Sequence, residues 1–300
     1  MNLQLSIAAV ALLGLAALGG AGCSAPIHIG QPVEVPAKGE IQVALGSGVS
    51  GSSAAYDLVT AANDKAKELA TKQYNCKASD KSDCLPSLQL REMVRGTYAM
   101  GLAGTVDVNM EGGGLYGLGH GLAIGGRLSS AGQRVDGLWQ FLDGKDASPW
   151  RGSLLLGYSH TSGKAPSVIQ DVLEFLKIPE ASRHSLHLGA QIGQKLGRYG
   201  WWQIGPHYLL SRHKFSMTPD IPILDEATKL IVNDYIPNTD TEGWSHHIGG
   251  SAALWLGYKP VFVGLELAAA WVKASPTLLG TVEEFSLVQI SPNVTILARF

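Results

Sequence analysis

The sequence predicts an all-β protein, an antiparallel up-and-down transmembrane barrel of about ten strands (roughly eight to twelve) with short helices in its extracellular loops. Segments of about ten residues recur in which apolar and polar side chains alternate, as they do in strands between two unlike environments. Apolar residues make up 45% of the chain and charged residues 16%, yet after residue 23 no stretch reaches the roughly 20 apolar residues of a membrane helix. In hydrocarbon, only a closed barrel then satisfies every backbone polar group.

The final strand shows the alternation most clearly. Its polar face carries mainly Asn293, Thr295 and Arg299, with Leu297 as an apolar exception. The other face is apolar and ends on the last residue, with Val294, Ile296, Ala298 and Phe300. This ending resembles the C-terminal insertion signal of bacterial outer-membrane β-barrel proteins. The resemblance implies a Gram-negative outer-membrane location, contact with outer-membrane lipid, and recognition of the last strand by the barrel-assembly machinery.

The N-terminus reads as a signal peptide over residues 1–22, because the apolar run Ile7–Leu18 is too short to span a bilayer comfortably and small residues follow it. The sequence Gly20–Cys23 is similar to a lipoprotein processing box, which implies cleavage before Cys23 and a lipid on that cysteine. Gly20 stands where such boxes have Leu, and residues 1–6 contain no Lys or Arg. The alternative is ordinary cleavage nearby, with Cys23 lost or left as a free thiol. Residues 23–38 then form a periplasmic linker.

Two of the three cysteines remain for a second role. Cys76 and Cys84 flank a short polar stretch typical of an exposed loop tip. In an oxidising periplasm this pair predicts a disulfide. A zinc site is the weaker alternative, because no further cysteine or nearby histidine completes a ligand set.

The barrel is expected to cover residues 39–300, with both termini in the periplasm. Ala103–Gly104, Gly197–Arg198 and Tyr258–Lys259 are then periplasmic turns, and the extracellular loops lie near 50–89, 163–183 and 214–243. Helical spacing of apolar residues predicts short helices at 53–74, 166–177 and 225–235. Residues 129–150 break the pattern and leave room for two more short strands around Val135–Leu142. The ten predicted strands are 39–49, 90–101, 104–112, 116–128, 151–162, 184–196, 199–213, 245–257, 260–273 and 285–300.

Parity assigns the two faces of each strand. In the segment 260–273, Val261 to Trp271 at alternate positions would face lipid and Glu266 would point inward. Such a narrow barrel is filled by its own side chains rather than lining a broad pore. The tryptophans, Trp201 and Trp255 included, suit interfacial girdles. The expected polar lumen residues are Arg95, Asp107, Glu111, Arg127, Lys195, Glu266 and Arg299.

One pair of side chains could carry chemistry. His160 and Ser162 lie two residues apart, on the same lipid-facing side of a strand, and a histidine can act as general base for a serine hydroxyl. The pattern resembles the His-x-Ser of outer-membrane phospholipase A and lipid A deacylase, although Gly163 stands where those families have Asn. The resemblance implies lipid acyl hydrolysis. The alternative is a pair of interfacial polar residues without catalysis.

The net charge of −2 and the lack of a basic stripe argue against nucleic-acid binding. No cofactor motif is found, and the histidines form no metal-ligand pattern. The preferred interpretation is a non-enzymatic barrel, either a narrow pore or transport component or a structural surface-binding protein, with a possible protein partner at the extracellular loops. The alternatives are the acyl hydrolase and a soluble periplasmic β-sandwich lipoprotein.

Overall fold

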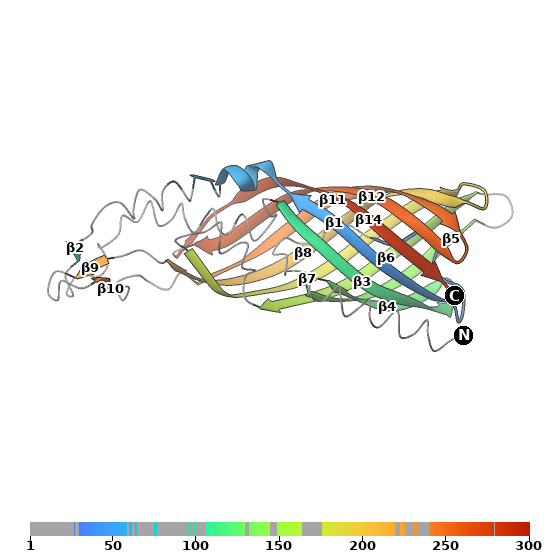
Figure 1. Ribbon diagram of the computed structural model, residues 1–300, viewed down its shortest axis with the longest axis horizontal. Coiled ribbons are helices and arrows are strands. Elements are labelled where there is room, and N and C mark those ends of the chain that lie inside the picture. Colours follow the sequence, from blue (N-terminus) through green and yellow to red (C-terminus); the bar gives the residue numbers. More distant parts are fainter. Residues whose placement is uncertain are drawn as a thin grey trace.

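The computed structural model describes residues 30–58, 106–129, 132–144, 149–163, 176–219, 240–278 and 280–300, with Ile27, 60–61, Asp64, 75–76, Arg95, Ala99, 223–225 and 231–232. Ten long strands form one closed antiparallel sheet (Figure 1). The sheet closes where the first strand pairs with the last, in a register that places Gln42 beside Arg299. These strands are β1 (Ile41–Gly51), β3 (Val106–Gly119), β4 (Leu122–Ser129), β5 (Gly132–Asp143), β6 (Trp150–Gly163), β7 (Leu176–Lys195), β8 (Gly200–Pro219), β11 (Thr241–Tyr258), β12 (Val261–Leu278) and β14 (Phe285–Arg299).

Short strands lie outside this cylinder. The two-residue β13 (Thr281–Val282) pairs with β12. A separate small sheet joins β10 (Ile231–Val232), β9 (Ile223–Asp225) and β2 (Asn75–Cys76), and it lies beyond the end of the barrel opposite to the C-terminus (Figure 1).

The barrel and its expected size are confirmed, but some strands lie elsewhere. The expected strand 90–101 is wrong where it can be checked, because Arg95 and Ala99 are helical. The barrel strand missing from the ten expected ones is β5. It is a single strand in the region where the sequence left room for two short ones. Residues 112–116 do not interrupt β3, since Gly113 belongs to the strand and its lack of a side chain admits close neighbours: a Cβ there would lie 2.5 Å from the carbonyl oxygen of Gly126.

Short connections mark the periplasmic end of the barrel. The expected turns at Gly197–Arg198 and Tyr258–Lys259 are found there, between β7 and β8 and between β11 and β12. The expected turn at Ala103–Gly104 lies outside the described residues. Its expected periplasmic position is wrong, because β3 starts beside Gly51, at the outer end of β1. His120 and Gly121 form the β3–β4 turn instead, both with positive φ.

The predicted loop elements are only partly found. Residues 53–58 are helical, as expected at the start of 53–74. The expected loop 163–183 is wrong in part, because β7 already begins at Leu176, and the expected helix 225–235 is interrupted by β10.

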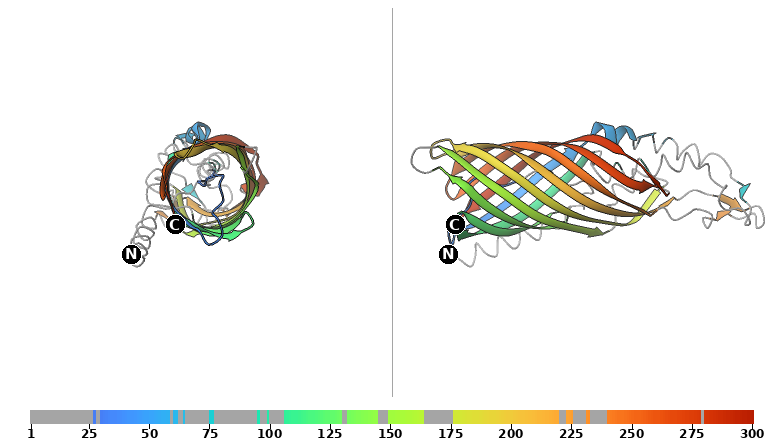
Figure 2. Two further views of the ribbon diagram at one scale, coloured as in Figure 1. Left: turned by 90° about the vertical axis from the view of Figure 1, so that its right-hand side faces the viewer. Right: turned by 180° about the vertical axis from the view of Figure 1, so that it is seen from behind.

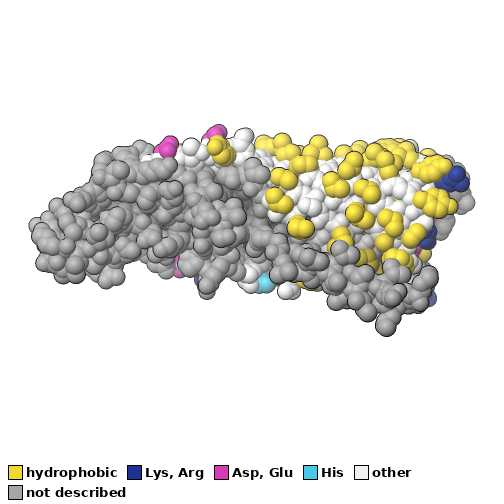
Figure 3. Space-filling model, viewed as in Figure 1, with side chains coloured by type: hydrophobic (Ala, Val, Ile, Leu, Met, Phe, Trp, Pro, Cys, Tyr) yellow, Lys and Arg dark blue, Asp and Glu magenta, His cyan; other side chains and the backbone are white. Residues whose placement is uncertain are grey.

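The outer wall of the barrel is apolar and the inner wall is polar. Along β12 every odd position is exposed and every even one buried, which confirms the assignment of Val261 to Trp271 to the lipid side. Apolar side chains cover the barrel wall in the space-filling view, with Lys and Arg at the periplasmic end (Figure 3). This arrangement overturns the soluble sandwich, which would bury its apolar face instead. In the described part of the chain, no helix is long and apolar enough to cross a membrane.

Several strands are longer than a membrane requires. A tilted spanning strand needs about 9–11 residues, whereas β7 and β8 have 20 each. Toward their outer ends the outward positions become polar, as at Arg212 and Lys214 on β8. The barrel wall therefore continues beyond the bilayer on the extracellular side.

Candidate functional site: a plugged lumen

The lumen is occupied by the chain's own N-terminal part. Residues 30–35, here called the plug, run inside the ring of strands, as the view along the barrel shows (Figure 2). Val33 has no exposed surface, and Gln31 and Val35 are nearly as buried. Ile27 packs deeper in the barrel against Ala268 and Ala270. Residues 30–35 of the expected periplasmic linker 23–38 therefore lie within the barrel.

Apolar packing holds the centre of the plug. Val33 belongs to a cluster of buried side chains that come from four strands, namely Trp201, Ala253, Trp255, Phe262 and Leu297. Leu297 was the apolar exception on the polar face of the last strand, and its place in this cluster gives the reason. Trp201 and Trp255 also face the lumen, so their assignment to an interfacial girdle is wrong. Trp139, Trp244 and Trp271 do lie exposed on the outer wall.

Lumen side chains satisfy the backbone of the plug, which forms no strand of its own. The amide of Gly30 donates to Glu266 Oε2 at 2.7 Å, and that of Val33 donates to Gln203 Oε1 at 2.6 Å. Gln203 in turn donates to the carbonyl oxygen of Gln31 at 2.7 Å. A buried backbone amide or carbonyl without a hydrogen-bond partner would cost free energy. These lumen side chains therefore supply the hydrogen bonds that the backbone of the plug needs.

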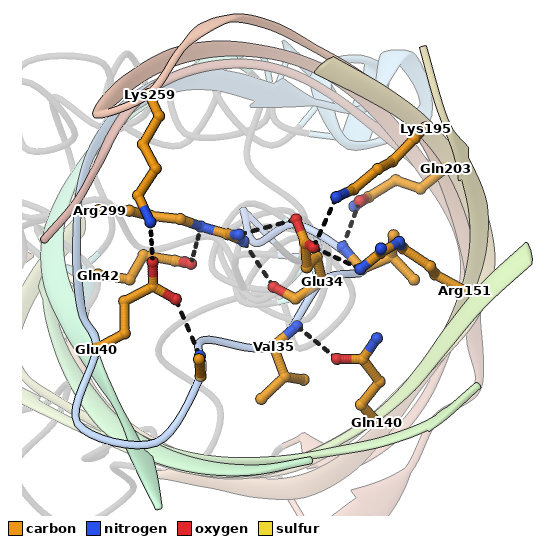
Figure 4. A network of polar contacts seen from close by, with 12 residues as sticks. Glu34, Val35, Glu40, Gln42, Gln140, Arg151, Lys195, Gln203, Lys259 and Arg299 are labelled. Atoms are coloured by element: carbon orange, nitrogen blue, oxygen red, sulfur yellow. Dashed lines mark hydrogen bonds and ion pairs between the residues drawn. The ribbon is translucent and has the colours of Figure 1, made fainter. Parts of the chain in front are cut away.

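Glu34 is the centre of an ionic network at the periplasmic mouth (Figure 4). Arg299 contacts its carboxylate at 3.0 Å, Lys195 lies at 3.2 Å, and Arg151 forms a third ion pair. Burial opposes ionisation of Glu34, but the three nearby cations outweigh it and hold the pKa of Glu34 below its ordinary value. The plug is thus fixed to three strands through one charged side chain.

A tight turn connects the plug to β1. Glu40 accepts a hydrogen bond from the amide of Ala37 at 2.9 Å and from Lys259 at 3.1 Å (Figure 4). Burial alone would raise the pKa of Glu40. The two hydrogen bonds and the charge of Arg299 outweigh burial, so the pKa of Glu40 lies below its ordinary value. Gly117 of β3 exchanges backbone hydrogen bonds with Gly39 and Glu40 at 2.9 and 3.0 Å.

A second charged cluster lies beside the plug. Asp136 forms ion pairs with Arg127 at 3.1 Å and with Arg134 at 2.6 Å, and Arg127 also contacts Glu111 at 3.3 Å. All four side chains are buried. The amide group of Gln31 lies within 3.2 Å of Arg127 Nε, which joins the plug to this cluster.

Polar side chains line the outer half of the lumen, where Arg183 is buried together with several histidines and serines. His187 contacts Ser159 at 2.9 Å, and Ser245 lies between His213 and His247, at 2.5 and 3.2 Å. No group of three metal-ligating side chains suited to a metal ion is found among the described residues. This part of the lumen is polar, narrow and filled by hydrogen-bonded side chains.

The expected lumen residues differ in their placement. The structure puts Glu111, Arg127, Glu266 and Arg299 inside the barrel, where all four are buried. Lys195 reaches Glu34 but remains half exposed. Arg95 belongs to no barrel strand and instead pairs with Glu283 at 3.7 Å. Asp107 lies in β3, with its side chain outside the described part.

Sequence reasoning missed the plug and several of the lumen residues around it, because nothing in the N-terminal segment itself predicted that it would enter the barrel. In the plug the missed residues are Gln31 and Glu34. On the strands they are Arg134, Asp136, Gln140, Arg151 and Gln203, of which Gln140 accepts a hydrogen bond from the amide of Val35 at 3.2 Å. Inward parity was the available signal for those on strands, and Glu34 had no such signal.

The lipid-facing histidine has a different neighbour from the expected one. His160 and Ser162 are both exposed on the outer wall of β6. The ring of His160 lies against that of His184, with centroids 4.4 Å apart and the planes tilted by 31°, and Tyr158 contacts His184 at 2.7 Å. Among the described residues, no hydrogen bond joins His160 to Ser162. Catalysis by this pair stays a prediction.

The remaining predicted sites are placed only in part. Val294, Ile296, Ala298 and Phe300 lie on the outward face of β14, and Ala298 is half-buried there. Cys76 lies in β2. Cys23 and Cys84 are outside the described residues, so lipidation and the disulfide stay predictions.

No family model matches the chain, and no curated protein matches it. Among solved structures it is similar to Ail, the attachment invasion locus protein of Yersinia pestis, with a TM-score of 0.29 and 8% identity over 88% of this chain and 99% of that one. It is also similar to CarO of Acinetobacter baumannii, with a TM-score of 0.31 and 11% identity over 56% and 92% of the two chains. The translocator domain of the autotransporter NalP from Neisseria meningitidis gives 0.28 and 9% over 99% and 95%.

Proposed function

We propose that the protein, an outer-membrane β-barrel of a Gram-negative bacterium, is a narrow pore or transport component that its own N-terminal segment keeps closed. The plug is the observation that supports this proposal. A barrel of ten strands is narrow enough to be closed by side chains alone. This barrel instead holds a separate, irregular segment through hydrogen bonds and ion pairs. Such contacts can be broken and remade without unfolding the wall.

Single-channel recording in planar bilayers tests the pore. The wild-type protein should remain closed most of the time, because the plug fills the periplasmic half of the lumen. Deletion of residues 30–35 should produce stable, small conductance steps. Glu34→Gln, which keeps the chain length, should produce brief openings.

A gel-migration comparison of boiled and unboiled samples shows whether each variant has formed a barrel. If both variants migrate as folded barrels and neither conducts, the pore proposal fails.

The second candidate is a structural surface-binding protein. It is favoured by the length of β7 and β8, which carry the barrel wall past the membrane on the outer side. Silence of the folded deletion variant would favour this candidate. The expected protein partner at the extracellular loops belongs to the same proposal.

Acyl hydrolysis by His160 and Ser162 has weaker support, since the ring of His160 lies against that of His184 and, among the described residues, no hydrogen bond joins it to Ser162. It requires that Ser162→Ala abolish release of fatty acid from outer-membrane lipids by the purified protein. Unchanged release would remove this candidate.

The proposal for export and assembly includes a signal peptide over residues 1–22 and recognition of β14 by the barrel-assembly machinery. Phe300 exchanges two backbone hydrogen bonds with Ile41, at 2.9 and 3.0 Å, while its ring lies exposed on the outer wall. Phe300→Ala should therefore lower the yield of assembled protein in cells and leave refolding into pure lipid unchanged. Equal yields in cells would contradict recognition of this ring.

Mass spectrometry of the mature protein tests both cysteine proposals. A lipid on Cys23 would appear as an added mass that Cys23→Ala removes. A disulfide between Cys76 and Cys84 would protect both thiols from alkylation until the protein is unfolded and reduced.

A further inference from the structure

The periplasmic mouth contains a cavity of about 460 Å³ beside the plug. Its described lining is unusually rich in charge, with Lys195, Arg198, Lys259 and Arg299 against only Glu34 and Glu40. Four cations and two carboxylates give the described lining a net charge of about +2. Arg151 adds a further cation behind Glu34.

The excess charge is available to a ligand because its carriers are solvent-exposed or, among the described residues, contact no carboxylate. Arg198 stacks over the ring of Tyr199 at 5.1 Å and donates to its hydroxyl at 2.9 Å, and among the described residues it contacts no carboxylate. The side chain of Lys259 is 68% exposed and that of Lys195 47%. Both ammonium groups can therefore turn from their present partners toward a bound anion.

The wall of the cavity also offers apolar surface. Trp201, Tyr258 and Phe262 line it beside the cations. The volume lies in the range of small-molecule sites, about 300–1,000 Å³. A bare inorganic ion would use the charges and leave the rings unused.

We propose that this cavity binds a small organic anion with two or more carboxylate or phosphate groups, presented from the periplasm. The ligand's charged oxygens pair with Arg198 and Lys259, and its carbon skeleton packs on Trp201 and Phe262. Charge-assisted hydrogen bonds from guanidinium and ammonium groups are the strong contacts for such a ligand.

Glu34 holds two further cations of the cavity, Lys195 and Arg299, and competes with the ligand for them. An anion that draws Lys195 and Arg299 away from Glu34 weakens the hold on the plug. This part of the inference rests on the proposed pore, and it makes the ligand an opener of the plug. It also predicts that removing a positive charge from the cavity weakens binding of the anion, whereas removing the negative charge of Glu34 strengthens it.

Isothermal titration of the purified full-length protein in detergent, at constant ionic strength, tests the site with citrate as the probe. Citrate should bind saturably, and acetate should not. Arg198→Gln should weaken citrate binding about tenfold, as loss of one charge-assisted contact implies. Glu34→Gln should strengthen it about tenfold, because a competing carboxylate is lost. Arg212→Gln removes an exposed cation at the outer end of the barrel and serves as the matched control, with unchanged affinity expected.

Absence of saturable citrate binding would overturn the site, as would an equal loss of affinity in Arg198→Gln and Arg212→Gln. Inorganic phosphate separates the two parts of the recognition, since an affinity equal to that of citrate would overturn the role of the aromatic wall. These titrations do not depend on conductance. If only the pore proposal fails, the variant without residues 30–35 will not conduct, whereas the full-length protein will still bind citrate.

Discussion

Arg299 donates two hydrogen bonds to Glu34, one from Nη1 to the carboxylate at 3.0 Å and one from Nη2 to the backbone carbonyl at 2.6 Å. Its Nε donates to Gln42 on the first strand at 3.1 Å. One guanidinium thus joins the last strand, the first strand and the plug. The planar fork of Arg allows this, and Lys would lose at least one of the contacts.

Arg299→Gln should therefore destabilise the plug about as much as Glu34→Gln. Loss of a charge-assisted pair in a partly buried site costs about 2 kcal/mol. The double variant should cost clearly less than the sum of the two single ones, because both remove the same contact. Urea unfolding in lipid vesicles measures the three free energies. Full additivity would show that the two residues act independently.

Whether the plug is closed or open should depend on pH through the ionisation of Glu34. Its pKa is lower in the folded protein than the ordinary value of 4.5, so its ion pairs stabilise the plug above that pH and are lost as the pH falls through the lowered pKa. Bilayer recordings of the wild type should show closed channels at pH 5 and above, and openings only below 4.5.

Glu40 also has a lowered pKa, so the Glu34→Gln variant is the necessary comparison. Its openings should already be present at neutral pH and change little on acidification. A wild type that opens equally at every pH would contradict control by Glu34.

Gly117 should tolerate no side chain, because the turn before β1 passes directly over it. A Cβ at this position would lie 1.9 Å from the carbonyl oxygen of Ala37. Gly117→Ala should displace the turn, loosen the plug and lower the free energy of unfolding by about 1–3 kcal/mol.

Gly137→Ala is the matched control on β5. Its added Cβ would meet only the carbonyl oxygen of Leu156, at 3.8 Å, which is an ordinary contact. Equal stability of the two variants, measured by urea unfolding, would show that the turn can move without cost.

Asp136 should be needed for the stability of the barrel itself. Asp136→Asn leaves Arg127 and Arg134 close together with one carboxylate fewer, and breaking a buried ion pair from one side costs about 3–5 kcal/mol. Glu284→Gln removes a carboxylate that is 73% exposed and, within the described ranges, pairs only with Lys273, so it should change stability by less than about 1 kcal/mol. The two variants should differ clearly in urea midpoint, and similar midpoints would show that the buried cluster is dispensable.

The barrel itself could be predicted from the sequence because alternation is a local property. Period-2 patterning at Val261 to Trp271 and at Val294 to Phe300 specifies both the strand and its lipid side. Glycine-rich segments were read less well. Two strands were expected at 104–112 and 116–128, but the glycines between them belong to β3, where they allow close approach of neighbouring strands.

The plug could not be predicted, because it is defined by contacts between distant residues. The two signs of it in the sequence were misread or left unexplained. Leu297 broke the polar face of the last strand, and Trp201 and Trp255 lay at inward positions although girdle residues should face out. All three belong to the buried cluster that contains Val33. An apolar side chain at an inward position of a narrow barrel is therefore a sign of something packed inside it.

The closed seam between β1 and β14 also bears on the order of assembly. Glu34 precedes β1, and Arg299 is the last residue of β14. Their contact forms only once the two ends of the sheet have met, whereas the turn at Gly117 needs only β1 and β3. The Glu34–Arg299 pair thus forms late in assembly. Its presence distinguishes a closed barrel from an open sheet in which the N-terminal segment is already bound at the turn.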